Sequence, residues 1–182
     1  MIGRKRFEEE AEKLQKIFGS EIITIHHIGS TSVYGLRAKP IIDIMPVVRD
    51  INKIDAFNDA MIVIGYEPKG ENGLPGRRYF QKGGNNRTHH VHIYEMDSPE
   101  KERYIAFRDY LIKHPTVAIG YGELKEALAK QFPYEIESYI KGKEQLVKEI
   151  EQAAKKWYKV TKETSTVHLA FMVYVYKMAS YL

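Results

Sequence analysis

Apolar and polar residues alternate with a helical period at the start of the chain. Over residues 4–18, apolar side chains recur three or four residues apart, so they share one face of an amphipathic helix. Gly19 follows the last of them and is a typical helix stop. The apolar positions are Phe7, Ala11, Leu14 and Phe18.

Four later segments are rich in β-branched and aromatic residues and predict strands. The segment Pro40–Val48 is an almost continuous apolar run, which suits a strand covered on both faces of a sheet. Asp50 then provides a cap for a predicted helix over 51–63, and Gly65 ends it. The predicted strands are 21–28, 40–48, 77–81 and 88–95, and the loops between them include 67–76 and 82–86.

After these strands the pattern becomes helical. Ser98 followed by Pro99 is a typical helix start, a cap residue before proline at the first helical position. Pro115 and Pro133 interrupt the pattern, because proline cannot continue a helix. Strands early and helices late predict an α+β fold, a mixed sheet with flanking helices and a C-terminal helical layer. The predicted helices span 99–113, 116–130 and 134–157.

The end of the chain differs in composition from the helices before it. A polar stretch is followed by a mostly apolar one over 167–182, so we expect a domain over 1–160 and an apolar C-terminal extension over 161–182. The apolar run is shorter than the roughly 20 residues of a membrane span, and we expect none. Its residue types fit a helix or a strand. We expect it to pack on the body or on a second subunit, as in a homo-oligomer.

Composition narrows the class of protein. The chain has 182 residues, of which 43% are hydrophobic and 29% charged, as is typical of a soluble globular protein. It has no cysteine, which excludes disulfides, thiolate metal ligands and cysteine nucleophiles. The basic N-terminus has no apolar core behind it, so we expect no signal peptide and a cytoplasmic location. The net charge of +4 is mild and interspersed with acidic residues, so nucleic-acid binding is not expected.

A carboxylate lies inside the second predicted strand. Asp43 interrupts an apolar run, and burying a carboxylate is costly unless a cation or a metal pairs with it. The first predicted strand ends in Gly29-Ser30, a tight turn whose backbone N–H groups can meet a phosphate. Together these elements predict a site for a metal-bound nucleotide. Met45 lies two residues after Asp43 on the same strand face, where a second carboxylate would be needed for a carboxylate pair.

A second group of candidate ligands lies in the last predicted strand. His90 and His92 are two residues apart, so both imidazoles point to one side. With Asp43 they form a candidate site for a divalent metal, for which Mg, Mn and Zn are the expected cofactors. The alternative is that the imidazoles hydrogen-bond Asp43 or a backbone carbonyl without a metal. Three other histidines are expected to be structural or exposed, His26, His27 and His89.

Basic residues form a third group of candidates. The planar guanidinium of arginine suits phosphate or carboxylate oxygens. Lys39 and Arg87 adjoin the two site motifs and would face an anion bound there. An ion pair with Asp109 is the alternative role for Arg108, and a solvated surface position is the alternative for Lys125. The candidate phosphate-binding residues are Gly29, Ser30, Thr31, Lys39, Arg78, Arg87, Arg108 and Lys125.

Three segments of the chain together resemble the GrpB family, within the nucleotidyltransferase-like superfamily. The first runs from Ile28 to Ile44 and contains the Gly-Ser turn and Asp43, the second is Arg87–Ile93, and the third begins at Phe107 and includes Lys125. The resemblance covers roughly residues 5–158. It implies a nucleotidyltransferase-like α+β fold.

The resemblance also implies roles for single residues. Active nucleotidyltransferases of this superfamily carry a Gly-Ser turn, a strand with two carboxylates and a third carboxylate on a later strand. Asp43 matches the first carboxylate, whereas Met45 replaces the second. On the later strand, His90 and His92 occupy the positions that face the site.

These features predict a nucleotidyltransferase-like protein that binds a nucleotide or another phosphate-bearing small molecule with a divalent metal. Asp43, His90 and His92 are its predicted catalytic and metal-binding residues, and the predicted reaction transfers a nucleotidyl group to a small molecule. Two alternatives remain open. One is a non-catalytic ligand-binding module with a degenerate transferase site, and the other is a metalloenzyme that uses the His-x-His pair without a nucleotide.

Overall fold

A single mixed sheet of five strands forms the centre of the computed structural model. The structure describes the backbone of residues 2–37 and 39–179 and the side chains of residues 3–37 and 39–164. The strands are β1 (Ile22–Ile28), β2 (Ile42–Val48), β3 (Tyr66–Pro68), β4 (Arg78–Lys82) and β5 (His89–Glu95). Their order across the sheet is β1-β2-β5-β4-β3, and only the central β2–β5 pair is parallel.

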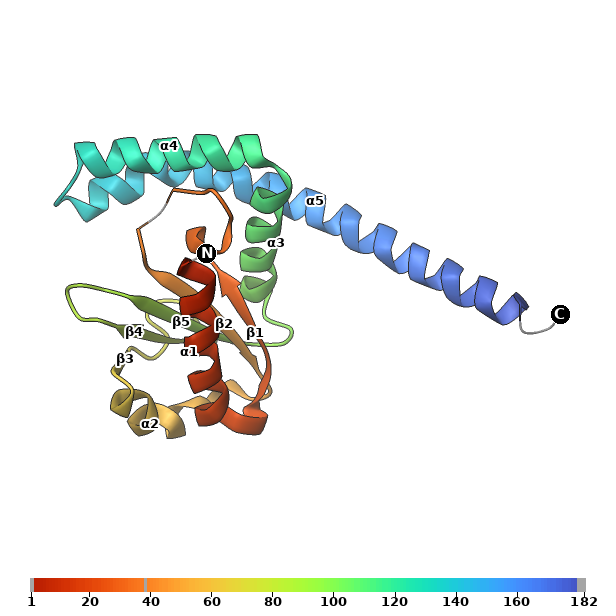
Figure 1. Cartoon of the computed structure of the whole chain (residues 1–182), viewed down its shortest axis with the longest axis horizontal. Coiled ribbons are helices and arrows are strands. Elements are labelled where there is room, and N and C mark those ends of the chain that lie inside the picture. The colour runs from red at the N-terminus through yellow and green to blue at the C-terminus, as the bar shows by residue number, and fades with distance from the viewer. Residues whose placement is uncertain (1, 38, 180–182) are drawn as a thin grey trace.

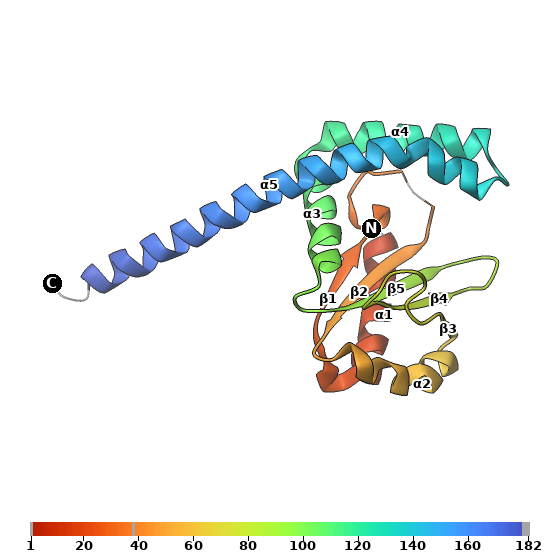
Figure 2. The same cartoon turned by 180° about the vertical axis from the view of Figure 1, so that it is seen from behind.

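Helices cover both faces of the sheet and one of its ends (Figure 1). The helices are α1 (Ile2–Phe18), α2 (Asn58–Val63), α3 (Pro99–Lys113), α4 (Pro115–Gln131) and α5 (Ile136–Ala179). α4 and the first half of α5 lie side by side as a helical layer, while the second half of α5 projects away from the body (Figure 2). The predicted α+β fold with a C-terminal helical layer is confirmed. None of the described helices is both long and apolar enough to cross a membrane.

Side-chain alternation along β2 divides the interior into two parts. Ile42 and Ile44 point toward α1 and join the larger core, which includes Leu14 and Phe18. Residues at odd positions of β2 point to the opposite face, where Met45 packs beneath α3. Asp43 shares that second face. The acidic residue of the strand is therefore directed away from the main core, toward the face on which α3 packs.

Three predicted elements differ from the structure. The predicted helix over 51–63 begins as a 3-10 helix (Ile51–Phe57), and only Asn58–Val63 is α-helical. Asp50 caps it as predicted, accepting a hydrogen bond from the Asn52 amide. The asparagine and aspartate residues of this stretch are weak helix formers, which favours the short, tight turns.

The predicted loop over 67–76 contains the end of β3, which pairs with β4. A three-residue strand that includes a proline has too little pattern to be distinguished from a loop. The predicted helix over 134–157 continues to Ala179, because no glycine or proline follows Gly142. The apolar extension is therefore helical up to Ala179, and residues 180–182 lie outside the described residues.

Candidate functional site

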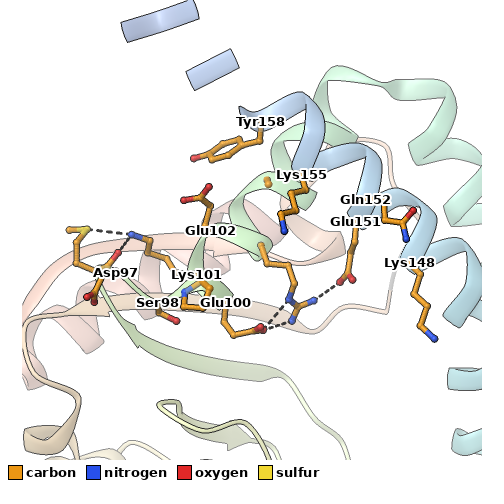
Figure 3. A pocket seen from close by; sticks show the side chains of 14 residues that line it. Asp97, Ser98, Glu100, Lys101, Glu102, Lys148, Glu151, Gln152, Lys155 and Tyr158 are labelled. Atoms are coloured by element: carbon orange, nitrogen blue, oxygen red, sulfur yellow. Dashed lines mark hydrogen bonds and ion pairs between the residues drawn. The ribbon is translucent and has the colours of Figure 1, made fainter. Parts of the chain in front are cut away.

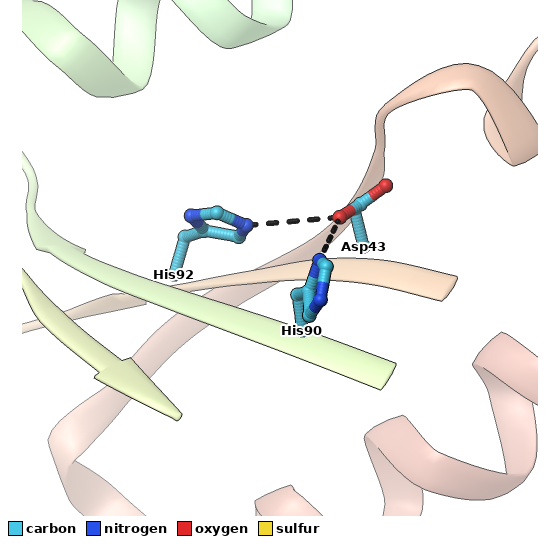
Figure 4. A group of neighbouring side chains, drawn as sticks. All are labelled: Asp43, His90 and His92. Carbon is cyan, nitrogen blue, oxygen red and sulfur yellow. Dashed lines mark hydrogen bonds and ion pairs between the residues drawn. The ribbon is translucent and has the colours of Figure 1, made fainter. Parts of the chain in front are cut away.

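The pairing of β2 with β5 brings the predicted metal ligands together. The two strands run parallel, and Asp43 lies directly beside His90. His92 is two residues further along β5 and points to the same face. Figure 4 shows both imidazoles turned toward the Asp43 carboxylate. Two neighbouring strands thus assemble all three side chains.

The three side chains are close enough to share one cation. His90 Nδ1 lies 3.1 Å from Asp43 Oδ1, within hydrogen-bond distance. His92 Nε2 lies 3.7 Å from the same oxygen, too far for a hydrogen bond. One candidate ligand atom from each residue lies within 4.8 Å of the other two. The exposed fractions of the side chains are 25% for Asp43, 19% for His90 and 12% for His92.

Burial and mutual contact set the charges of this group. Burial alone would raise the pKa of Asp43, but the hydrogen bond from His90 and the attraction of His92 outweigh it and lower the pKa to about 2. Burial lowers the pKa of His92, and the Asp43 carboxylate opposes this shift in part. At neutral pH the group offers an ionised carboxylate and a neutral His92 ring, the forms in which these side chains bind metals.

The glycine of the Gly-Ser turn is pressed against Asp43. Gly29 has a φ of 70°, in the left-handed region, and a Cβ built on it would lie 2.3 Å from Asp43 Oδ2. Any other residue would be strained here, because its Cβ would displace the Asp43 carboxylate and the backbone conformation disfavours a side chain. Ser32 Oγ donates a hydrogen bond to the Gly29 carbonyl, and Thr31 Oγ1 donates one to the Ile41 carbonyl. Thr31 therefore braces the turn against β2.

Lys125 reaches the same turn from α4. Its Nζ donates a hydrogen bond of 2.7 Å to Ser30 Oγ and lies 4.7 Å from the centre of the Tyr121 ring. The residue is only 8% exposed. Burial, reinforced by the charge of nearby Lys143, lowers the pKa of Lys125 to about 8. The structure thus makes Lys125 a buried cation at the turn, and the alternative of a solvated surface lysine does not apply.

Two more lysines border this region. Lys143 from α5 and Lys39 from the loop before β2 both lie over the ring of Tyr139, at 5.0 and 5.8 Å from its centre. Burial lowers the pKa of Lys143, while the charge of Asp43 opposes the shift. Neither Lys143 nor Tyr139 could be predicted from the sequence, since neither lies in a motif. A cavity of about 460 Å³ is lined by Arg37, Lys39, Lys125, Glu126, Ala129 and Tyr139.

Two of the three arginines predicted to bind phosphate pair with other groups. Arg78 lies on the opposite face of the sheet from His92, and its guanidinium makes two hydrogen bonds of 2.7 and 2.9 Å to Asp55. Arg108 donates hydrogen bonds to the Asp109 carboxylate and to the His27 carbonyl, so it forms the structural ion pair given as its alternative. Arg87 is exposed in the loop before β5. The structure does not bring Arg78 to the site.

Among the described histidines outside this group, His27 and His89 have structural contacts. His27 stacks on Phe7 and its Nε2 is 3.1 Å from Thr31 Oγ1. His89 is buried, with Nδ1 3.0 Å from Thr88 Oγ1. Burial lowers the pKa of each to about 4, so both rings are neutral at physiological pH. His26 is half-buried on β1.

Met45 occupies the position where the nucleotidyltransferase pattern has its second carboxylate. Its side chain is fully buried and packs with Ile28 and Tyr94, against Tyr104 and Ile105 of α3. A carboxylate at this position would lie in an apolar environment, where ionisation is costly. The departure from the nucleotidyltransferase pattern is therefore part of the packing between the sheet and α3.

A second, larger cavity lies apart from these residues. It has a volume of about 680 Å³ between the start of α3 and the middle of α5 (Figure 3). Charges of both signs line it, and several already pair with each other. Arg103 bridges Glu100 and Glu151 across the cavity. Because these charges offset one another, the cavity offers no excess charge to a ligand. We therefore place the candidate functional site at Asp43, His90 and His92.

Residues 4–153 match the family described as GrpB protein. The chain belongs to the GrpB family. It is 55% identical over 153 residues to UPF0157 protein YqkA of Bacillus subtilis, covering 84% of this chain and 45% of YqkA. Glutamate-rich protein GrpB of Alkalihalophilus pseudofirmus is 33% identical over 152 residues, covering 81% of this chain and 87% of that protein.

A solved structure of a family member has the same fold. The crystal structure of conserved protein GrpB from Enterococcus faecalis superposes with a TM-score of 0.82 at 46% identity, covering 85% of this chain and 93% of that one. The present chain spans less than half of the length of YqkA, 45%. What the longer relatives do as whole proteins is therefore not carried over to this chain.

Proposed function

We propose that this chain binds a nucleotide or a similar phosphate-bearing small molecule together with a divalent cation, and transfers a nucleotidyl group to a small-molecule acceptor. The support for it is spatial. The Gly29-Ser30 turn meets Asp43 on one side and Lys125 on the other. A phosphate bound at the turn would contact donors, a cation and a metal ligand at once.

The observation that carries the proposal is a group of lysines that form no ion pair with a described acidic residue, although the charge of Asp43 attracts Lys125 and Lys143 at longer range. Within the described part of the chain, the ammonium groups of Lys39, Lys125 and Lys143 contact only a hydroxyl group and aromatic rings. They also repel one another, because Lys143 lowers the pKa of Lys125 and Lys39 lowers that of Lys143. Lys125 is buried, Lys143 is half-buried and Lys39 is exposed, and like charges repel more strongly where water is excluded. A bound polyanion would offset this repulsion.

The chain's own residues suggest how such a ligand would be held. Ser30 and Lys125 would contact one phosphate, and Lys39 and Lys143 would neutralise the adjoining phosphates. Asp43, His90 and His92 would hold the cation, which supplies charge neutralisation at the phosphate that reacts. The α4–α5 layer carries two of the lysines, and it would restrict access of water to the turn.

A second candidate function is a binding module without catalysis. Met45 favours it, because only one of the carboxylates of the transferase pattern is present. Both candidates predict binding of the same ligand. They differ in turnover, since only a transferase releases pyrophosphate from a nucleoside triphosphate when an acceptor is present.

Replacing Lys125 with methionine is expected to weaken ligand binding without destabilising the protein. A hydrogen bond to a charged group contributes about 1.5–3 kcal/mol, which corresponds to a loss of affinity of about 10- to 100-fold. Isothermal titration calorimetry with ATP, GTP, CTP and UTP, each with Mg²⁺ or Zn²⁺, measures it. The melting temperature should be unchanged or higher, because methionine removes a charge that is costly to bury.

Lys16→Met is the matched control for this experiment. Lys16 is an exposed lysine of α1, which covers the other face of the sheet. The Lys16→Met protein should bind every nucleotide with the affinity of the unmodified protein. Equal affinity of the Lys125→Met and Lys16→Met proteins, or no binding of any nucleotide by the unmodified protein, would contradict the proposal.

Affinity for the phosphate ligand is expected to fall as the pH rises above about 8. The Lys125 ammonium is neutralised near pH 8 instead of at its ordinary 10.5, and a neutral amine attracts no phosphate. Lys143, Ser30, Tyr121 and the charge of Asp43 surround it. Binding constants between pH 6.5 and 9.5 measure this, and the Lys125→Met protein should show a flatter profile. Because the pKa of Lys125 is lower in the folded protein than in the unfolded chain, its charge reduces the free energy of unfolding below about pH 8. This destabilisation decreases as the pH rises from 8 to 10.5.

A further inference from the structure

We infer that the cation held by Asp43, His90 and His92 is Zn²⁺ or another late first-row transition metal, and not Mg²⁺. The inference rests on the proposed function insofar as it takes these three residues as the cation's ligands. It departs from the carboxylate-rich site that the nucleotidyltransferase pattern implies. Three independent features of the site support it.

The first feature is the chemistry of the donor atoms. The group offers two imidazole nitrogens and one carboxylate. Mg²⁺ prefers oxygen ligands in octahedral geometry, whereas imidazole suits Zn²⁺, Co²⁺, Ni²⁺ and Fe²⁺. Met45 is fully buried where a second carboxylate would have to lie, so β2 contributes one oxygen ligand to this group.

The second feature is the lack of hydrogen bonds at His92. Among the residues that the structure describes, no partner lies within hydrogen-bond distance of either ring nitrogen, although the side chain is only 12% exposed. Buried polar groups are nearly always hydrogen-bonded. A metal bound to Nε2 would give His92 the interaction that its protein environment does not supply.

The third feature is the spacing of the donors. Ligands about 2.0–2.1 Å from a tetrahedral zinc ion lie roughly 3.3 Å from one another. The distances from Asp43 Oδ1 are 3.1 Å to His90 Nδ1 and 3.7 Å to His92 Nε2, on either side of that value. Small rotations of the side chains would therefore complete the site. Three protein ligands leave a fourth position open for a phosphate oxygen.

Titration of the chelator-treated protein with a metal alone tests the inference. Zn²⁺ and Co²⁺ should each bind in a 1:1 ratio by calorimetry and raise the melting temperature, and Mg²⁺ at millimolar concentration should do neither. Co²⁺ should also produce visible absorption bands of a low-coordinate nitrogen- and oxygen-ligated centre. These readouts require no nucleotide and no activity. Equal responses to Mg²⁺ and Zn²⁺ would overturn the inference.

Single-residue variants locate the bound metal. His92→Ala and Asp43→Asn should each reduce Zn²⁺ affinity by more than the 10- to 100-fold that loss of an outer contact typically causes. His26→Gln removes another half-buried histidine and should leave affinity unchanged. Undiminished Zn²⁺ binding by a folded His92→Ala protein would overturn the inference. If a variant fails to fold, the Co²⁺ spectrum of the unmodified protein still tests the inference. A spectrum typical of an octahedral centre with oxygen ligands alone would contradict binding by His90 and His92.

The inference and the proposed function fail separately. Nucleotide binding with Mg²⁺ but no Zn²⁺ binding would refute the transition-metal assignment and leave the phosphate site in place. Zn²⁺ binding at Asp43, His90 and His92 with no binding of any nucleotide would support the transition-metal assignment and refute the proposed function. It would then favour a metalloenzyme that uses the same three ligands without a nucleotide.

Discussion

Replacing Gly29 with alanine is expected to displace the Asp43 carboxylate and to lower the melting temperature by about 4–20 °C. The new Cβ would lie 2.3 Å from Asp43 Oδ2, so either the turn or the carboxylate must move. The positive φ of Gly29 adds about 1–2 kcal/mol of backbone strain, and overpacking adds about 1–3 kcal/mol. For a domain of this size, each kcal/mol shifts the melting temperature by about 2–4 °C. Thermal unfolding followed by circular dichroism measures it.

Gly35→Ala separates the two contributions. Gly35 has a φ of 78°, similar to that of Gly29, but nothing lies within 4 Å of a Cβ built on it. It should therefore show the strain without the clash, and should bind Zn²⁺ and nucleotides normally. Equal loss of stability and equal metal binding in the two variants would show that the contact between Gly29 and Asp43 has no role.

Replacing Met45 with aspartate is expected to destabilise the protein by about 3–5 kcal/mol in metal-free buffer, because it removes a buried side chain and places a carboxylate among apolar groups. Met45 is fully buried with Ile28 and Tyr94. Burial should raise the pKa of the new carboxyl group. The stability deficit should therefore be largest at neutral pH and decrease as the pH falls, when the carboxyl group becomes protonated.

Met45→Leu is the control for packing alone and should cost less than about 1.5 kcal/mol. Urea unfolding of both variants at pH 5 and pH 7.5 gives the comparison. An aspartate at position 45 that leaves stability unchanged and creates Mg²⁺ binding would show that the site is a carboxylate site from which one ligand is missing. That result would contradict the view that Met45 belongs to the core beneath α3.

Local patterns were sufficient to predict most elements of the fold and the centre of the site. The apolar run that contains Asp43 predicted β2, and its single acidic residue marked the candidate site. The spacing of His90 and His92 predicted that both rings share one face, and their place in β5 follows from the same alternation. Pro115 and Pro133 predicted where helices begin and end.

Other parts of the site depend on contacts that no local pattern contains. Lys143 lies a hundred residues from Asp43 in the chain, and only the packing of α5 on α4 brings the two together. Arg78 has the composition expected of a phosphate ligand, but strand alternation places it on the opposite face, where Asp55 binds it. The buried state of Lys125 likewise follows from the position of α4 beside the Gly-Ser turn.

The most direct test of the account is a crystal structure of the protein with Zn²⁺ and a non-hydrolysable nucleoside triphosphate, with anomalous diffraction recorded on both sides of the zinc edge. One anomalous peak is expected, about 2.0–2.2 Å from an Asp43 oxygen and from one nitrogen each of His90 and His92. Phosphate density is also expected in contact with Ser30 and Lys125. Zinc bound elsewhere, or a nucleotide whose phosphates do not contact this turn, would contradict the account.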